Sequence, residues 1–294
     1  MPDAAAGDTA ASAPRRATAD PDVFLIPDAE LPPGFAERLE APADLPPEPR
    51  PAATVVLARD GTRGVEALLL RRPARSRFAA DAWVFPGGRV DAADADPALA
   101  ALCDGPPPAM WGRRLGLADP AEAMSYVLAA LREAFEETGV LLARAASGKA
   151  LAAAAAAEGR AALLAERATL RELAEHSGLR YLTEDFTYLA HWITPEPEPR
   201  RYDTRFFLAP LPAGQSADPH RPELVEAAWL APAKAVERFR TGAMKMLPPT
   251  VHTLRRLAGF PTVTEAIAAL RDAPVPTILP TMRRHPEGVT IEIG

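Results

Sequence analysis

The chain has 294 residues, 48% of them hydrophobic, and a formal net charge of -6 at pH 7. This acidic balance argues against sequence-independent nucleic-acid binding, which needs a basic surface that displaces counterions from phosphates. The single cysteine excludes an internal disulfide and a thiol-rich zinc site, and no apolar run approaches the roughly 20 residues that span a bilayer.

The first fifty residues are rich in alanine, proline and acidic residues and contain one short apolar segment, Val23 to Ile26. This composition predicts a disordered tail over residues 1–50, followed by a single domain over residues 51–294. The N-terminus has no hydrophobic signal-peptide core, and its aspartates are unlike a transit peptide. We therefore expect a cytoplasmic protein without a membrane partner. The sequence indicates no oligomeric state.

Three short strands are expected at the start of the domain. Apolar runs at residues 53–58 and 66–71 flank Asp60-Gly61, a pair that is typical of hairpin turns. A third run at residues 83–85 ends at Pro86-Gly87-Gly88, which should not continue regular structure. Residues 91–119 contain three consecutive prolines and are predicted to be irregular.

The next segment has clear helix boundaries. Asp119 is a suitable N-cap, Pro120 suits the first helical position, and Glu122 lies three residues after the cap. Gly139 can adopt the left-handed conformation that ends a helix. A helix is therefore predicted from Pro120 to Thr138.

The remaining chain mixes helices and strands. The Ala-rich residues 151–175 predict one or two helices that end near Gly178, and a proline-rich loop is expected at residues 195–202. The predicted strands cover residues 188–194, 205–209 and 226–230, and the later helices cover residues 231–240, 249–258 and 263–271. Elements in this order indicate an α/β or α+β domain.

The predicted helix at residues 120–138 has two different faces. Its apolar stripe, which can pack against a sheet, consists of Met124, Val127, Leu128, Leu131 and Phe135. Glu133, Glu136 and Glu137 fall on the opposite side within one turn, where their mutual repulsion favours either solvation or a bound cation. These oxygen ligands suit Mg²⁺ or Mn²⁺. On spacing alone, the solvated face of an amphipathic helix is the commoner explanation.

Two motifs change that balance. Residues 132–140, REAFEETGV, resemble the second half of the Nudix box, and residues 85–91, FPGGRVD, resemble its first half. The resemblance implies a Nudix-like α/β/α sandwich with a mixed β-sheet and metal-dependent hydrolysis of a phosphate anhydride. It also implies that Glu133, Glu136 and Glu137 are catalytic and hold Mg²⁺ or Mn²⁺. The backbone carbonyl of Gly88 completes this set, and Arg132 pairs with a box carboxylate to support the site.

The box is interrupted in this chain. The family has a glutamate a few residues after the second glycine, where this chain has Asp94, and about seven residues usually separate it from the Arg-Glu pair. An insertion at about residues 95–119 lengthens this gap by roughly thirty residues, and a helical extension follows at about residues 145–178. The interrupted box resembles the Nudix branch that includes the peroxisomal coenzyme A diphosphatase of mammals. So do HWITP at residues 191–195, RYDTRFF at residues 201–207 and LPPT at residues 247–250.

A signature of bacterial-type coenzyme A hydrolases is matched only in part. The residues that fit it are Leu68, Leu69, Arg72 and Arg77, and those that differ are Leu70, Pro73 and Asp81. The partial match weakens the assignment of coenzyme A. Arg72 and Arg77, with Arg75 between them, remain candidate phosphate-binding residues, although an arginine cluster is as often a solvated patch.

The sequence leaves the general base and the substrate mouth open. Candidates for the base are Glu133, Glu223 and Glu226, although a glutamate beside a strand is more often simply exposed. Aromatic candidates for the mouth are His191, Trp192 and Tyr202. Trp192, like Phe207, is more often part of the core.

The leading function is hydrolysis of a small-molecule nucleotide diphosphate, with coenzyme A or acyl-coenzyme A as the first candidate. ADP-ribose, NADH or a nucleotide sugar is the alternative substrate. A non-catalytic nucleotide-binding module of the Nudix fold is the alternative class, but a pure binder has no need of a metal cluster. No nucleic-acid partner is expected.

Overall fold

The computed structural model describes residues 16–17, 20–31, 34–40, 46–76, 79–145, 151–218 and 225–293. Its central strands are β3 (Arg50–Gly61), β4 (Gly64–Arg71), β5 (Trp83–Val84), β6 (Gly87–Arg89), β10 (Thr187–Ile193), β11 (Tyr202–Pro210), β12 (Glu226–Leu230) and β13 (Thr277–Ile278). They form one sheet in the order β12-β4-β3-β11-β10-β13, with β5 paired to β4 and β6 paired to β3. The sheet is mixed, because β3 is parallel to β11 and antiparallel to β4.

Side chains of the central strands alternate between two hydrophobic cores. On β3, Ala53, Val55 and Leu57 belong to one core, whereas Val56 and Ala58 belong to the other. Successive side chains of a strand point to opposite faces of a sheet, so this alternation shows that both faces are covered.

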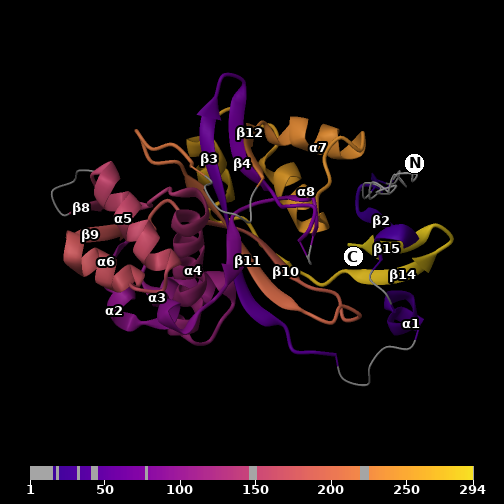
Figure 1. The fold of residues 1–294 in the computed structure, drawn as a ribbon, viewed down its shortest axis with the longest axis horizontal. Helices are drawn as coiled ribbons and strands as arrows, with labels where there is room; N and C mark the ends of the chain where they lie inside the picture. The colour runs from indigo at the N-terminus through magenta and orange to yellow at the C-terminus, as the bar shows by residue number, and fades with distance from the viewer. Residues whose placement is uncertain are drawn as a thin grey trace, which may run out of the picture.

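Helices cover the two faces. The helices that matter here are α3 (Pro108–Leu115), α4 (Pro120–Thr138), α7 (Pro232–Arg240), α8 (Pro248–Leu257) and α9 (Val263–Leu270). Helix α4 packs against β3 on one side, and α7 and α8 lie on the other side (Figure 1). The arrangement is the α/β/α sandwich with a mixed sheet that the sequence predicted.

Helix α4 has the boundaries that its sequence predicted. The side chain of Asp119 accepts a hydrogen bond from the backbone N–H of Ala121, and Pro120 takes the first helical position. Gly139 ends the helix in the left-handed conformation, with φ of 72°. The helix is buried over most of its length, including Arg132 and Glu133.

The insertion and the helical extension pack together as one lobe. Its elements are η2 (Ala92–Ala95), α2 (Pro97–Ala100), β7 (Cys103–Asp104), α3, β8 (Ala143–Ala145), α5 (Ala153–Leu164), α6 (Leu170–Ser177) and β9 (Leu179–Leu182). We call them the insertion lobe. A small sheet in the order β7-β9-β8 joins the insertion to the extension. The prediction of irregular structure for residues 91–119 was wrong, because Pro97 and Pro108 each take the first position of a helix, which proline permits.

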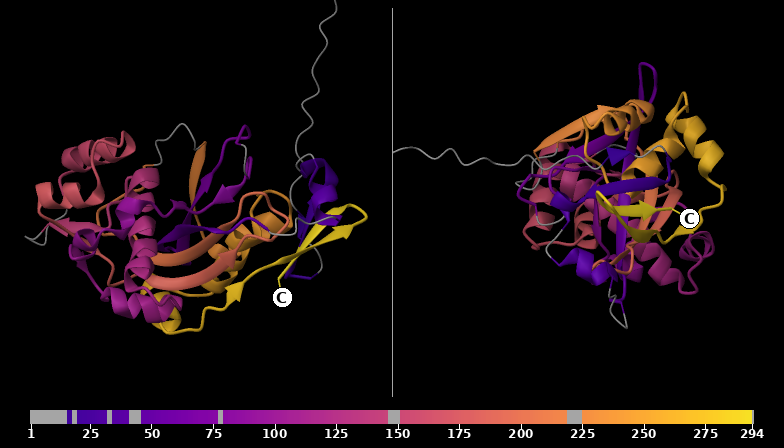
Figure 2. Two further views of the ribbon diagram at one scale, coloured as in Figure 1. Left: turned by 90° about the horizontal axis from the view of Figure 1, so that it is seen from below. Right: turned by 90° about the vertical axis from the view of Figure 1, so that its right-hand side faces the viewer.

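A second small sheet joins the two ends of the sequence. Its strands are β1 (Arg16–Ala17), β2 (Val23–Pro27), β14 (Thr281–His285) and β15 (Gly288–Glu292), and η1 (Asp28–Glu30) and α1 (Phe35–Glu40) follow β2. We call it the terminal sheet (Figures 1 and 2). The disordered tail predicted for residues 1–50 differs from the structure at β2, because β15 supplies it with a strand partner. Residues 1–15, 18–19, 32–33 and 41–45 of that prediction lie outside the described residues.

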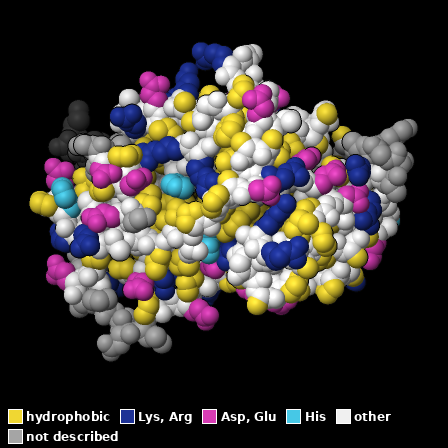
Figure 3. Space-filling model, turned by 180° about the vertical axis from the view of Figure 1, so that it is seen from behind, with side chains coloured by type: hydrophobic (Ala, Val, Ile, Leu, Met, Phe, Trp, Pro, Cys, Tyr) yellow, Lys and Arg dark blue, Asp and Glu magenta, His cyan; other side chains and the backbone are white. Residues whose placement is uncertain are grey.

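Two further observations concern the surface and the glycine turn. None of the helices in the described part of the chain combines the length and hydropathy needed to cross a membrane. On the face shown in Figure 3, acidic and basic side chains are intermixed around groups of hydrophobic ones. Gly87 and Gly88 do not end regular structure as predicted, since both lie in β6 and pair with Thr54 and Ala53 of β3.

Candidate active site

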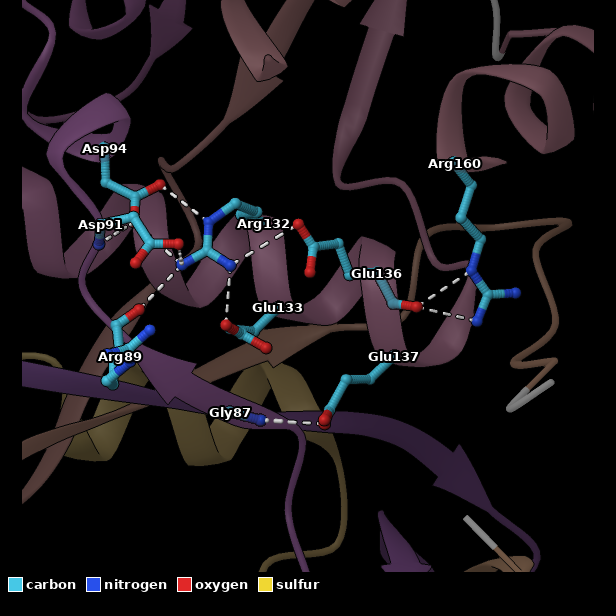
Figure 4. A network of polar contacts seen from close by, with 9 residues as sticks. All are labelled: Gly87, Arg89, Asp91, Asp94, Arg132, Glu133, Glu136, Glu137 and Arg160. Carbon is cyan, nitrogen blue, oxygen red and sulfur yellow. Dashed lines mark hydrogen bonds and ion pairs between the residues drawn. The ribbon is translucent and has the colours of Figure 1, made fainter. Parts of the chain in front are cut away.

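The Gly-Gly turn and the glutamates of α4 meet despite the long insertion between them. The backbone N–H of Gly87 donates to Glu137 Oε2 at 3.1 Å. A side chain at position 88 would place its Cβ 2.3 Å from Glu133 Oε1, so only glycine leaves room for that carboxylate. Figure 4 shows the hydrogen bond between Gly87 and Glu137. The two halves of the motif therefore form one site.

Glu133 and Glu136 converge on the guanidinium group of Arg132. Its Nη1 lies 2.7 Å from Glu133 Oε1 and 3.6 Å from Glu136 Oε1. Glu133 is only 7% exposed, so a solvated helix face does not describe this part of α4. A buried carboxylate, Glu133, and a partly exposed one, Glu136, lie beside one positive charge, which indicates a site that already favours a cation.

Arg132 also fixes the insertion lobe to the motif. Its Nε and Nη2 donate to the two carboxylate oxygens of Asp94, each at 3.0 Å, and Nη2 donates to the carbonyl of Arg89 at 2.8 Å. Burial disfavours the charge of Arg132, but the hydrogen bonds to Asp94 and the nearby carboxylates outweigh it and raise the pKa of Arg132. Asp94, whose role the sequence left open, is thus a carboxylate that Arg132 binds in the structure.

The donor set around Gly88 suits a hard divalent cation. Carboxylate oxygens of Glu133, Glu136 and Glu137 are the ligand type that Mg²⁺ and Mn²⁺ prefer, and Gly88 gives the Glu133 carboxylate room beside the backbone of β6. Among the described residues, no group of three or more His, Cys, Asp or Glu side chains is already arranged around one metal position. In this structure the chain's own donors, Arg132 and the Gly87 N–H, contact these carboxylates.

Helix α5 of the insertion lobe supports the C-terminal end of α4. Arg160 donates from Nε and Nη2 to the carbonyl of Glu136, at 3.1 and 3.0 Å, and from Nη1 to the carbonyl of Asp218. A cation at the last turn of a helix satisfies its open carbonyls and complements the helix dipole. The extension therefore orients the turn that carries the glutamates.

A cavity of about 240 Å³ opens beside Gly87 and Glu137. Arg72 lies in its wall, and its Nε is buried without a hydrogen-bond partner. Aromatic and proline side chains from β10, β11 and the start of α8 form much of the remaining wall. They include Phe85, Trp192, Pro195, Tyr202, Phe206, Pro248 and Pro249. The cavity thus combines one basic group and an apolar lining, as small-molecule sites commonly do.

The structure separates the remaining candidates. Trp192 lines the cavity and is also buried in the core at 3% exposure, whereas Phe207 is entirely core. His191 does not line the cavity, because it is held between Asp203 and Thr277 by bonds of 2.6 and 2.8 Å. Glu226 forms an exposed ion pair with Arg71 away from the cavity. The structure places Arg75 on the surface, and Arg77 and Glu223 lie outside the described residues.

Several residues of the site were missed by sequence reasoning. Glu198, in the proline-rich loop, is a second carboxylate in the cavity wall, and Pro280 and Ile291 reach the wall from the C-terminal region. Arg160 lies in an Ala-rich helix that carries no chemical motif. Only Glu198 had a usable signal, since a loop glutamate beside a motif is a natural candidate.

Comparisons with known proteins agree with this geometry. The family model described as "NUDT19 Nudix domain" matches residues 49–257. The "Acyl-coenzyme A diphosphatase NUDT19" of Homo sapiens is 31% identical over 74% of this chain and 70% of its own length, and that of Gallus gallus is 30% identical over the same shares. A crystal structure of a NUDIX hydrolase from Alicyclobacillus acidocaldarius has a TM-score of 0.62 at 29% identity, covering 77% of this chain and 99% of that one.

Proposed function

This chain belongs to the Nudix hydrolase family, and from that premise we propose that it hydrolyses the diphosphate bridge of a coenzyme A derivative at the site beside Gly87 and Gly88. The observation that carries the proposal is the contact of both glycines with the glutamates of α4, next to a cavity that contains Arg72. The coenzyme A assignment is supported by the activity in the names of the two curated relatives, each about 30% identical.

The proposal assigns one group of residues to the metal ion and one residue, Arg72, to the phosphate. Glu133, Glu136 and Glu137 would hold Mg²⁺ or Mn²⁺ together with the carbonyl of Gly88. When bound, such an ion neutralises phosphate charge and lowers the pKa of a bound water. Arg72 binds a phosphate oxygen, because a guanidinium group pairs well with phosphate and its Nε has no hydrogen-bond partner among the described residues.

Arg132 is a positioning residue in this proposal. It is bonded on one side to Asp94 and the Arg89 carbonyl and on the other to Glu133, so it keeps the loop of the first half of the motif beside the helix of the second half. Its buried position places it behind the glutamates rather than in the cavity wall.

The reaction consumes one water. A water oxygen forms a bond to one phosphorus, the bridging P–O bond breaks, and the leaving phosphate takes the bridging oxygen. The products are two phosphate monoesters, one carrying the nucleoside and one carrying the other half of the substrate. With Glu137 assigned to the metal ion, Glu198 is the other carboxylate in the lining of this cavity, and in this proposal it accepts the proton of the water.

A panel of substrates tests the proposal. The purified full chain is incubated with Mg²⁺ or Mn²⁺ and, separately, with coenzyme A, an acyl-coenzyme A, ADP-ribose, NADH and a nucleotide sugar, and the products are identified by mass. We expect cleavage of the coenzyme A compounds with the highest kcat/KM, and no cleavage when a chelator is present. Preferred cleavage of ADP-ribose, NADH or a nucleotide sugar would replace the substrate assignment. Tight binding of one compound without turnover of any would identify a non-catalytic module.

A further inference from the structure

The terminal sheet lies outside the part of the chain that matches the family. The family model ends at residue 257 and begins at residue 49, whereas β2 precedes this region and β14 and β15 follow it. Nevertheless, Phe24, Ile26 and Ile291 of this sheet are buried in the same core as Trp192 and Phe206. The terminal sheet is therefore packed onto the family domain at the cavity.

Two residues from this region form part of the cavity wall. Pro280 follows β13 and Ile291 lies in β15, and both line the same cavity as Gly87 and Glu137. In the sheet order, β6 with Gly87 pairs with β3, and β11 and β10 separate β3 from β13. Strand β6, which carries Gly87, and strand β13, which precedes Pro280, are therefore separated along the sheet by β3, β11 and β10.

A buried ion pair holds the N-terminal part of this region against the cavity wall. Lys245 Nζ lies 2.5 Å from Glu30 Oε2, and the two side chains are 12% and 3% exposed. The carbonyl of Lys245 also accepts a hydrogen bond from the backbone N–H of Trp83 at 2.8 Å. Lys245 precedes the segment Leu247 to Thr250, which lines the cavity. The ion pair therefore joins η1, which follows β2 of the terminal sheet, to the residue two positions before the lining segment Leu247 to Thr250.

The two ends of the cavity differ in chemistry. Arg72, Glu137 and the Gly87 N–H at one end suit phosphate and its counterion. Pro280 and Ile291 have no side-chain group that can donate or accept a hydrogen bond. We propose that Ile291 and Pro280 receive the apolar acyl tail of the substrate and set the tail length that the enzyme accepts. This inference rests on the proposed function and adds a specificity-determining element to it.

Variants with a larger or a smaller side chain at position 291 test the inference. Wild type, Ile291→Trp and Ile291→Ala are assayed with coenzyme A and with its acetyl, hexanoyl and dodecanoyl thioesters in the presence of Mn²⁺. Because the cavity is small, at about 240 Å³, we expect Ile291→Trp to lower kcat/KM at least ~10-fold for the longest tail that wild type accepts. The readout is the ratio of kcat/KM for this thioester to kcat/KM for free coenzyme A, which should fall in Ile291→Trp because free coenzyme A has no acyl tail to exclude. Ile291→Ala should shift the preference toward longer tails.

The matched control is Ile26→Ala. Ile26 lies in the same small sheet, pairs with Val289 and is 4% exposed, but it does not line the cavity. It should lose about as much stability as Ile291→Ala while keeping the wild-type order of tail preference, and thermal unfolding compares the two. Equal loss on every substrate in the Ile291 variants, or the same shift in Ile26→Ala, would overturn the inference. Wild type without activity on any of the four compounds would instead overturn the proposed function, and this inference with it.

Discussion

Glu136 makes a longer contact with Arg132 than Glu133 does, at 3.6 Å against 2.7 Å, while Glu137 accepts a hydrogen bond from Gly87. Replacing Glu136 therefore changes a proposed metal ligand with little effect on the contacts between β6 and α4. Among the three glutamates it separates catalysis from folding most cleanly.

Glu136→Gln should lower kcat at least ~100-fold, because an amide is a weaker ligand for a hard cation than a carboxylate. Steady-state kinetics with the substrate identified by the panel measure this change, and thermal unfolding should show a midpoint close to that of wild type. Glu122→Gln is the control, since Glu122 is an exposed residue in the first turn of the same helix. Full activity of Glu136→Gln would show that Glu136 is not a required metal ligand.

Asp94→Ala should destabilise the fold by about 3–5 kcal/mol, because it leaves the buried charge of Arg132 without its bidentate partner. Urea unfolding measures the loss. In an Arg132→Ala background, the same substitution should cost clearly less, since the two residues act as a pair. Additive losses in this double-mutant cycle would show that the two side chains do not support each other.

At the residue scale, the sequence predicted which motif residues gather at the site better than it predicted the contacts of residues outside the motif. The glutamates and the Gly-Gly turn belong to two recognisable halves of one motif, so their proximity in the fold could be expected. His191 could not be excluded from the substrate mouth without knowing that Thr277, from a distant strand, binds its ring. Ile291 could not be placed at all, because an isolated apolar residue in a terminal strand carries no signal of a cavity.

At the element scale, predictability followed the strength of local signals. Helix α4 was predicted from Pro120 to Thr138, as found, because an N-cap, a first-turn proline and a terminal glycine all mark its ends. Strands β7 and β14 were not predicted, since their partners, β9 and β15, are defined only by the tertiary fold. The predicted helices at residues 151–175 correspond to α5 and α6, which end before Gly178.

The insertion lobe contains a natural reporter of its own integrity. Cys103 is the only cysteine in the chain, and burial raises the pKa of its thiol to about 12. Arg180 on β9 donates to Asp104 and to the carbonyls of Ala101 and Cys103, which holds β7 in place. Local opening of β7 should therefore speed the reaction of this thiol, which is partly buried in the folded chain.

Arg180→Ala should increase the rate at which a thiol reagent labels Cys103 by about tenfold or more, because hydrogen bonds to a charged group contribute roughly 1.5–3 kcal/mol to such local stability. Labelling is followed at constant pH under native conditions. Arg144→Ala should have a smaller effect, since Arg144 is more exposed and contacts this strand only through Asp104. Unchanged labelling in Arg180→Ala would mean that β7 is held by other contacts.

At the scale of the whole molecule, a ligand that binds only the folded state should stabilise it. Mn²⁺ at about 100 times its dissociation constant adds ~2.7 kcal/mol, which corresponds to a rise of ~5 °C or more in the unfolding midpoint of a chain of this size. Thermal unfolding with and without a chelator measures the shift. Glu136→Gln should show a much smaller rise, and an equal rise in that variant would place the ion elsewhere.

The overall architecture was predictable from the order of elements and from the family resemblance, whereas its two small sheets were not. Both sheets bring together segments that are distant in sequence, and a local pattern contains no information about such pairing. That residues 51–294 form a single domain remains a prediction. Helices cover both faces of the central sheet. This agrees with the side chains of its strands, which alternate between two hydrophobic cores.

The pairing of Val23 with Glu292 has a consequence for biosynthesis. A ribosome adds about 5–20 residues per second, so β2 emerges long before β15 exists and lacks its partner β15 while the intervening residues are made. The part of the cavity wall that Ile291 supplies is thus completed only after residues 49–257 have been made. A chain that stopped after α8 would contain Gly87, Gly88 and the three glutamates of α4, and yet lack Pro280 and Ile291, the residues proposed to contact the acyl tail.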